Sequence, residues 1–156
     1  VQQGTNTTVL GVKELEEKTQ PRDPVLAGAR ILVVDDEPNI RMTIAAVLRK
    51  YDAVVEVALS GTEAIEKIND SHFDLVLSDI KMPDRSGYDV FSAAQKRDPA
   101  PPVILMTGFG YDPSHCIVRA SQEGLAEVLF KPFRAVQLLD EVRRALKNRV
   151  AVAGHA

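Results

Sequence analysis

The sequence predicts an α/β protein whose core is a doubly wound, five-stranded parallel sheet with helices on both faces. Five short apolar runs are separated by segments with helical periodicity, and glycine or proline marks most of the boundaries. Strands that alternate with helices over about 120 residues favour a parallel sheet covered on both sides. The apolar runs are residues 31–34, 53–58, 75–78, 103–106 and 128–130.

The first strand and helix are indicated by an apolar run that changes into an acidic turn. Residues 31–34 are short, apolar and β-branched, which favours a buried strand. Pro38 follows the acidic residues 35–37. Proline suits the first turn of a helix, and an acid before it can cap the free amides. The apolar face of this helix comprises Ile40, Ile44, Val47 and Leu48.

The second helix is indicated by its start signal. After the strand at 53–58, Ser60 is an N-cap residue, and Glu63 completes a capping box. The third strand, 75–78, must stop before Pro83, because proline cannot donate to a sheet ladder. A third helix follows Gly87.

The second half of the chain continues the alternation. Prolines end the third helix before the strand at 103–106, and a fourth helix is predicted from Asp112 to Glu123, where Gly124 ends it. The fifth strand at 128–130 precedes a last helix, 133–148. We therefore expect a flexible linker or tail at 1–28, one domain at 29–148 and a C-terminal tail at 149–156.

Composition excludes several classes of function. A net charge of −3 gives no reason to expect direct nucleic acid binding, and no apolar run reaches membrane-spanning length. The single cysteine, Cys116, cannot form an internal disulfide, and the first residues lack the pattern of a signal peptide. We expect a cytoplasmic protein, or a cytoplasmic part of a larger one, without membrane insertion.

Polar residues follow four of the predicted strands. Asp35 and Asp36 follow the first, Asp79 the third, Thr107 the fourth and Lys131 the fifth. The carboxyl ends of parallel strands share one edge, which is where ligands bind in such sheets. We therefore expect these groups to converge on one shallow site.

The expected site suits phosphoryl transfer. Three adjacent carboxylates repel one another unless they share a proton or hold a cation, and an oxygen-only set suits Mg²⁺, with Mn²⁺ as a substitute. The absence of His and Cys at these strand ends argues against zinc. A carboxylate nucleophile could form an acyl phosphate, while Thr107 and Lys131 contact the phosphoryl oxygens.

Each residue alone also has a structural explanation. The acids at 35 and 36 could merely cap a helix, Asp79 could be a turn residue before Pro83, and Lys131 with its proline could be a surface turn. Thr107 alone could be an ordinary strand end. Their occurrence together, at one edge and in this order, favours a functional site.

The same motifs resemble the receiver domain of two-component response regulators, from Arg30 to Asn148. The family implies a flavodoxin-like sheet with strand order 2-1-3-4-5. The stretches that carry the resemblance are residues 31–38, 74–87, 103–108 and 130–133.

The resemblance implies a role for each site residue. Asp79 would accept phosphate from a histidine kinase or a histidine phosphotransfer protein. Asp36, Asp79 and the backbone carbonyl of Lys81 would bind Mg²⁺, with Asp35 acting mainly through water. Thr107 and Lys131 would contact the phosphoryl group.

The resemblance also implies two conformational features. The Lys131–Pro132 peptide is expected to be cis. Phosphorylation would switch a surface built from the fourth helix, the fifth strand and the fifth helix, through which a homodimer could form.

Two positions depart from the family pattern. Val128 stands where the family often has an aromatic partner for the threonine. The loop from Phe109 to His115 is longer than usual by about two residues, as befits a weakly constrained segment. His115 and Cys116 are interpreted as a helix-start residue and a buried small apolar group.

Other functions remain open to comparison. The chain could be the receiver of a hybrid histidine kinase. An aspartyl-phosphate phosphohydrolase is disfavoured because Lys81 stands where that class has a second acid, and a nucleotide- or flavin-binding domain because no glycine-rich loop follows the first strand. A pseudo-receiver that binds partners without phosphate is disfavoured because every chemical position is filled.

Overall fold

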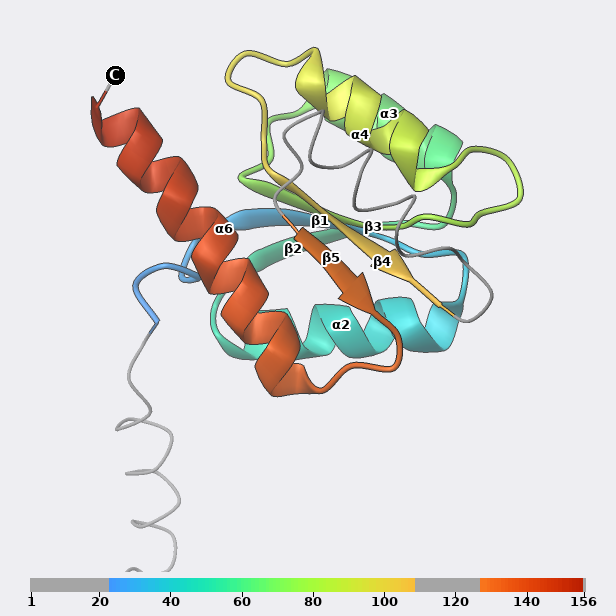
Figure 1. Ribbon diagram of the computed structural model, residues 1–156, viewed down its shortest axis with the longest axis horizontal. Helices are drawn as coiled ribbons and strands as arrows, with labels where there is room; N and C mark the ends of the chain where they lie inside the picture. The colour runs from blue at the N-terminus through green and yellow to red at the C-terminus, as the bar shows by residue number, and fades with distance from the viewer. Residues whose placement is uncertain (1–22, 109–126, 156) are drawn as a thin grey trace, which may run out of the picture.

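The computed structural model describes residues 23–108 and 127–155, which contain a five-stranded parallel sheet (Figure 1). Its strand order, β2-β1-β3-β4-β5, confirms the predicted fold class and the order that the resemblance implied. Every strand falls on the apolar run that predicted it. The strands are β1 (Arg30–Val34), β2 (Val54–Ala58), β3 (Leu75–Asp79), β4 (Val103–Thr107) and β5 (Glu127–Phe130).

Helices cover both faces of this sheet, as Figure 1 shows. Alternate residues of β1 point to opposite sides: Ile31 and Val33 pack with α2 and α6, whereas Leu32 and Val34 pack with α3 and α4. The helix predicted at 112–123 lies outside the described residues. The described helices are α2 (Pro38–Lys50), α3 (Gly61–Asp70), α4 (Gly87–Gln95) and α6 (Ala135–His155).

The burial of the central strands explains why the strands of the sheet could be predicted from the sequence. Every residue of β3 and of β4 is buried. Parallel strands covered on both faces are continuous apolar runs rather than alternating ones. Among the helices in the described ranges, none has the length and apolar character needed to cross a bilayer.

The N-cap predicted for α3 is confirmed, whereas the side-chain cap predicted for α2 is wrong. Ser60 Oγ accepts a hydrogen bond from the Glu63 amide at 3.1 Å, as expected of an N-cap. At α2, however, Glu37 occupies the N-cap without a side-chain capping bond. The Glu37 amide instead donates to Asp35 Oδ1 at 2.9 Å, so the preceding acids organise the turn rather than cap the helix.

The segment before β1 packs against the domain, so the expected linker up to residue 28 is wrong for residues 23–28. Leu26 is fully buried in the cluster between the sheet, α2 and α6. The Gly28 amide donates to the Asp52 carbonyl at 2.9 Å. The apolar stretch Val25-Leu26-Ala27 is too short to show a periodicity, so only the tertiary contacts of Leu26 reveal its place.

Arg143 of α6 joins the same segment to the rest of the fold. Its Nε donates to the Asp23 carboxylate, and its guanidinium carbon lies 5.8 Å from the centroid of the Tyr51 ring. Burial would raise the pKa of Asp23, but the hydrogen bond and charge of Arg143 outweigh it and lower that pKa. The ion pair therefore holds Asp23 ionised.

The last helix is longer than predicted. Its expected end at Asn148 is wrong, because α6 continues to His155. No glycine or proline occurs between Asn148 and Gly154, and two alanines in that stretch favour helix.

We expect Arg143→Gln to lower the free energy of unfolding by about 1 kcal/mol, through loss of the ion pair and the ring contact. Arg144→Gln is the matched control, because Arg144 pairs with Glu141 on the same helix and its side chain is 62% exposed. It should cost less than about 0.5 kcal/mol. Urea denaturation measures both, and equal losses would show that Arg143 has no special role.

Candidate functional site

Three carboxylates meet at the carboxyl edge of the sheet. Asp35 and Asp36 follow β1, Asp79 ends β3, and β1 and β3 are parallel neighbours. One carboxylate oxygen of each lies within 4.8 Å of those of the other two. Asp35 is fully buried and Asp79 is 8% exposed, whereas Asp36 is open to solvent. The set could bind a metal ion through oxygen ligands, open on one side.

Lys131 brings a positive charge to these acids. It follows β5, and its Nζ lies 2.9 Å from Asp35 Oδ2 and 3.5 Å from Asp79 Oδ2. Its backbone amide donates to the Thr107 carbonyl at 2.7 Å, which fixes the start of the loop. The Lys131–Pro132 peptide is cis, as the resemblance implied.

The charges of the site perturb its titration. Burial, and repulsion from Asp35 and Asp36, raise the pKa of Asp79 from its ordinary value of 3.8 to about 6, although Lys131 opposes this. Burial alone would lower the pKa of Lys131, but Asp35 and Asp79 outweigh it and raise that pKa. When all four groups are ionised, one ammonium leaves two negative charges uncompensated, which a divalent cation would balance.

Thr107 ends β4, the strand next to β3 in the sheet, so it lies at the same edge as Asp79. The residue is 2% exposed, and its Oγ1 has no hydrogen-bond partner among the described residues. A buried hydroxyl without a partner costs about 1–3 kcal/mol. Such a group is suited to a ligand that supplies an acceptor.

Arg41 is a supporting residue that the sequence interpretation missed. It is 8% exposed on α2, and its Nη1 donates to the Asp35 carbonyl at 2.8 Å. It shares the buried helix face with Ile44 and Leu48. A cation at a core position of an amphipathic helix was the available signal.

The loop after Asp79 carries Lys81, whose side chain is exposed. Ile80 donates its amide to the Met106 carbonyl at 2.9 Å, and Gly87 donates to the Ile80 carbonyl at 2.8 Å. These bonds close the base of the loop. The role of the Lys81 carbonyl in metal binding stays a prediction.

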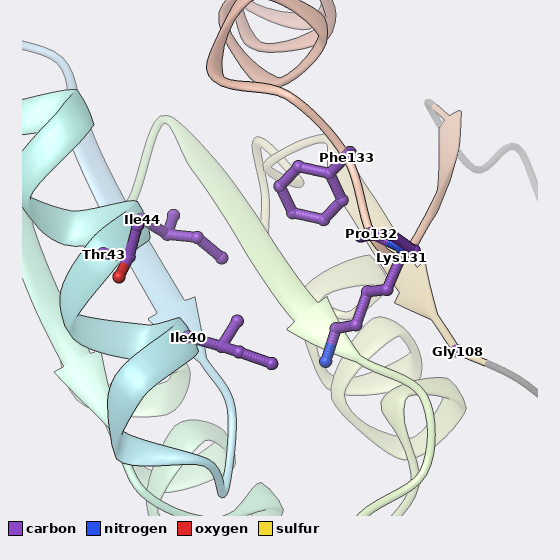
Figure 2. Close-up of a pocket in the computed structure, with 7 residues that line it drawn as sticks. All are labelled: Ile40, Thr43, Ile44, Gly108, Lys131, Pro132 and Phe133. Carbon is purple, nitrogen blue, oxygen red and sulfur yellow. The ribbon is translucent and has the colours of Figure 1, made fainter.

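An apolar cavity of about 360 Å³ adjoins Lys131. Figure 2 shows Ile40 and Ile44 projecting from α2 toward the segment after β5, where Ile40 points toward the end of the Lys131 side chain. Apolar walls with one charged group at the opening are typical of a pocket that binds a ligand. The lining residues are Ile40, Thr43, Ile44, Gly108, Lys131, Pro132 and Phe133.

Of the two departures from the family pattern, the structure describes the one at Val128 and not the longer loop. Val128 is 8% exposed on β5 and is paired in register with Leu105 of β4, so an aliphatic side chain occupies the position. The effect of this change on switching stays a prediction. Phe109, His115 and Cys116 lie outside the described residues.

Comparisons with known proteins agree with this geometry. Residues 31–143 match the model of the response regulator receiver domain family. The chain is 34% identical over 120 residues to the transcriptional regulatory protein GlrR of Escherichia coli (strain K12), an alignment that covers 77% of this chain and 27% of that protein. It is 30% identical over 122 residues to the chemotaxis protein CheY of Thermotoga maritima, covering 77% of this chain and 99% of CheY.

Solved structures show the same likeness. A CheY-like receiver domain protein from Methanospirillum hungatei JF-1 aligns with a TM-score of 0.73 and 29% identity, over 80% of this chain and 98% of that one. A receiver domain from Clostridium thermocellum aligns with a TM-score of 0.73 and 32% identity, with the same two coverages.

The sheet and its acidic edge define a receiver-type α/β domain. The family match covers most of the chain, and the chain belongs to the response regulator receiver domain family of two-component systems. Members of this family typically serve as signalling phosphoacceptors rather than true enzymes, and the family implies a histidine kinase partner. The chain spans about a quarter of the length of the transcriptional regulatory protein GlrR.

Proposed function

We propose that this chain is a phosphoacceptor that takes a phosphoryl group onto Asp79 from a histidine kinase or a histidine phosphotransfer protein. The observation that carries the proposal is the position of Asp79 within the cluster of three carboxylates, with Lys131 Nζ 3.5 Å from its Oδ2. A bond would form between an Asp79 oxygen and phosphorus. The donor's phosphorus–nitrogen bond would break, and its electron pair would leave with the imidazole.

The site residues would divide the remaining work. Asp36, Asp79 and the Lys81 carbonyl would hold Mg²⁺ or Mn²⁺, and Asp35 would act mainly through water. The all-oxygen donor set and the open side at Asp36 fit a magnesium ion that retains water. When bound, the ion would supply positive charge to the phosphoryl oxygens.

Lys131 and Thr107 would respond to the new phosphoryl group. Lys131 already contacts two of the acids, so its ammonium can form a charge-assisted hydrogen bond with a phosphoryl oxygen. The unpartnered Thr107 hydroxyl can donate another. The formation of these two hydrogen bonds would shift Thr107 and Lys131, and so transmit phosphorylation to the β4–β5 side of the sheet.

A protein donor must dock before transfer. The apolar cavity between α2 and the segment after β5 adjoins Lys131, so a donor helix seated there would lie close to Asp79. The switching surface would involve β5, α6 and the helix predicted at 112–123. A homodimer through that surface stays a prediction, because the helix predicted at 112–123 lies outside the described residues.

The alternative is the receiver of a hybrid histidine kinase, in which the same chemistry would serve a phosphorelay within a larger chain. The matches to a short chemotaxis protein and to longer transcriptional regulators are compatible with several outputs. The phosphohydrolase alternative stays disfavoured, because the exposed Lys81 replaces the second acid.

Incubation with acetyl phosphate and Mg²⁺ should add one phosphoryl group to the intact protein, as measured by mass spectrometry. Asp79→Asn should abolish this gain, because an amide is not a competent nucleophile. Asp70→Asn, at the exposed end of α3, is the matched control and should gain phosphate normally. No gain by the unmodified protein with several small phosphodonors and with either metal would contradict the proposal.

A further inference from the structure

The N-terminus of α3 is closed by an acid from a different element. Asp84, in the loop between β3 and α4, accepts hydrogen bonds from the Gly61 amide at 3.2 Å and the Thr62 amide at 2.9 Å. Ser60 takes the next two amides, from Glu63 through its hydroxyl and from Ala64 through its carbonyl. The four N-terminal amides of α3 therefore all have acceptors, two of them across the fold.

Gly61 lets the loop come this close. A Cβ added at Gly61 would lie 2.5 Å from the Arg85 Cβ and 3.0 Å from the Arg85 carbonyl oxygen. No side chain can occupy that space unless the loop moves away. The requirement for glycine here is therefore one of close approach rather than of backbone angle.

The loop that Asp84 attaches to α3, residues 80–86, directly follows the proposed phosphoacceptor Asp79. Its base is closed by the Gly87–Ile80 hydrogen bond, and Met82 packs against the core between the sheet, α3 and α4. Asp84 provides the anchor farther along, on α3. Lys81 lies between the base of the loop at Ile80 and the anchors at Met82 and Asp84, so its backbone depends on how the loop is held.

We propose that Asp84 is a positioning residue for the metal site: together with Gly61 it holds loop 80–86 on the N-terminus of α3 and thereby places the Lys81 carbonyl. The inference rests on the proposed function, which assigns that carbonyl to Mg²⁺. Asp84 acts only through the loop. A carboxylate suits this role because its two oxygens accept from adjacent amides, and its charge is favourable at a helix N-terminus.

The test measures the Mg²⁺ concentration that half-saturates phosphorylation by acetyl phosphate, and separately the rate at saturating Mg²⁺. Asp84→Ala should raise the half-saturating concentration about tenfold, as is typical when support for a metal ligand is lost. The rate at saturating Mg²⁺ should change less than about twofold, because the nucleophile and Lys131 are intact. Asp84→Asn, which keeps one acceptor oxygen, should show a smaller increase.

Two further variants separate positioning from helix stability. Ser60→Ala removes the other cap of the same helix end without releasing the loop, so its half-saturating Mg²⁺ concentration should match that of the unmodified protein. Gly61→Ala displaces the loop by a different route while favouring helix intrinsically. Gly61→Ala should raise the half-saturating Mg²⁺ concentration as Asp84→Ala does. It therefore tests the inference even if Asp84→Ala folds poorly.

The outcomes distinguish the inference from the proposed function. An unmodified protein that gains no phosphate overturns both. Normal phosphorylation of the unmodified protein with unchanged Mg²⁺ dependence in Asp84→Ala and Gly61→Ala overturns the inference alone. Equal Mg²⁺ defects in Ser60→Ala and Asp84→Ala also overturn it, because the effect would then be one of helix stability.

Discussion

Gly87→Ala is expected to lower the free energy of unfolding by about 1–3 kcal/mol. A Cβ at this position would lie 2.6 Å from the Asp79 carbonyl oxygen, 2.9 Å from the Ile80 Cα and 3.0 Å from Leu105 Cδ2. The first two are backbone atoms, so no rotamer change can relieve the contact. Urea denaturation measures the loss.

The same substitution should slow phosphorylation. A Cβ at position 87 would crowd the backbone of the residue that we propose as the nucleophile, and the Gly87 amide donates to the Ile80 carbonyl. Relief of the contact must therefore displace the backbone of Asp79 or the loop after it. A displacement of about 1 Å at a reacting group costs on the order of a hundredfold in rate, so we expect a loss of tenfold or more with acetyl phosphate.

Gly108→Ala is the matched control for stability. Gly108 lies just after β4, and nothing comes within 4 Å of a Cβ built there. The free energy of unfolding of Gly108→Ala should differ from that of the unmodified protein by less than about 0.5 kcal/mol. If Gly87→Ala were as stable as Gly108→Ala, the backbone around Asp79 would have to be more adaptable than the contacts indicate.

The predictability of the fold follows from where each signal is encoded. Strands β3 and β4 are buried on both faces, so they were visible as apolar runs. The strand order depends on crossovers that periodicity does not encode, and it came from the family resemblance. The packing of Leu26 was missed because a single buried side chain has no pattern.

The site divides in the same way. Asp35, Asp79 and Lys131 could be expected together because parallel strands bring their carboxyl ends to one edge. The Asp84–Gly61 contact could not, because it joins residues 23 positions apart through backbone amides that any sequence possesses. Contacts of side chains with backbone amides can therefore be found only in the structure, whereas the meeting of polar residues at the strand ends can be predicted from the sequence.

In the metal-free protein at neutral pH, Asp79→Asn is expected to raise the free energy of unfolding by about 2–3 kcal/mol. Burial and the neighbouring acids raise the folded-state pKa of Asp79 from 3.8 to about 6. The folded protein therefore binds this proton more tightly than the unfolded chain does. Its stability falls as the pH rises from about 4 to about 6, and asparagine, which does not ionise, escapes that loss.

The measurement is urea denaturation in EDTA at pH 4 and pH 7.5. The advantage of the Asn variant should be small at pH 4, where Asp79 is largely protonated in the folded state, and complete at pH 7.5. Asp70→Asn, an exposed acid at the end of α3, should show little difference at either pH. An advantage of Asp79→Asn that is equal at both pH values would refute the assignment to the Asp79 charge.

Magnesium should reverse the comparison. A cation that binds the folded site stabilises it by mass action, and the unmodified protein has one more carboxylate ligand than Asp79→Asn. Saturating Mg²⁺ at pH 7.5 should therefore raise the free energy of unfolding of the unmodified protein more than that of the variant. The repulsion that destabilises the empty site is thus the same property that makes it bind a divalent cation, and the two effects should depend on the same carboxylate.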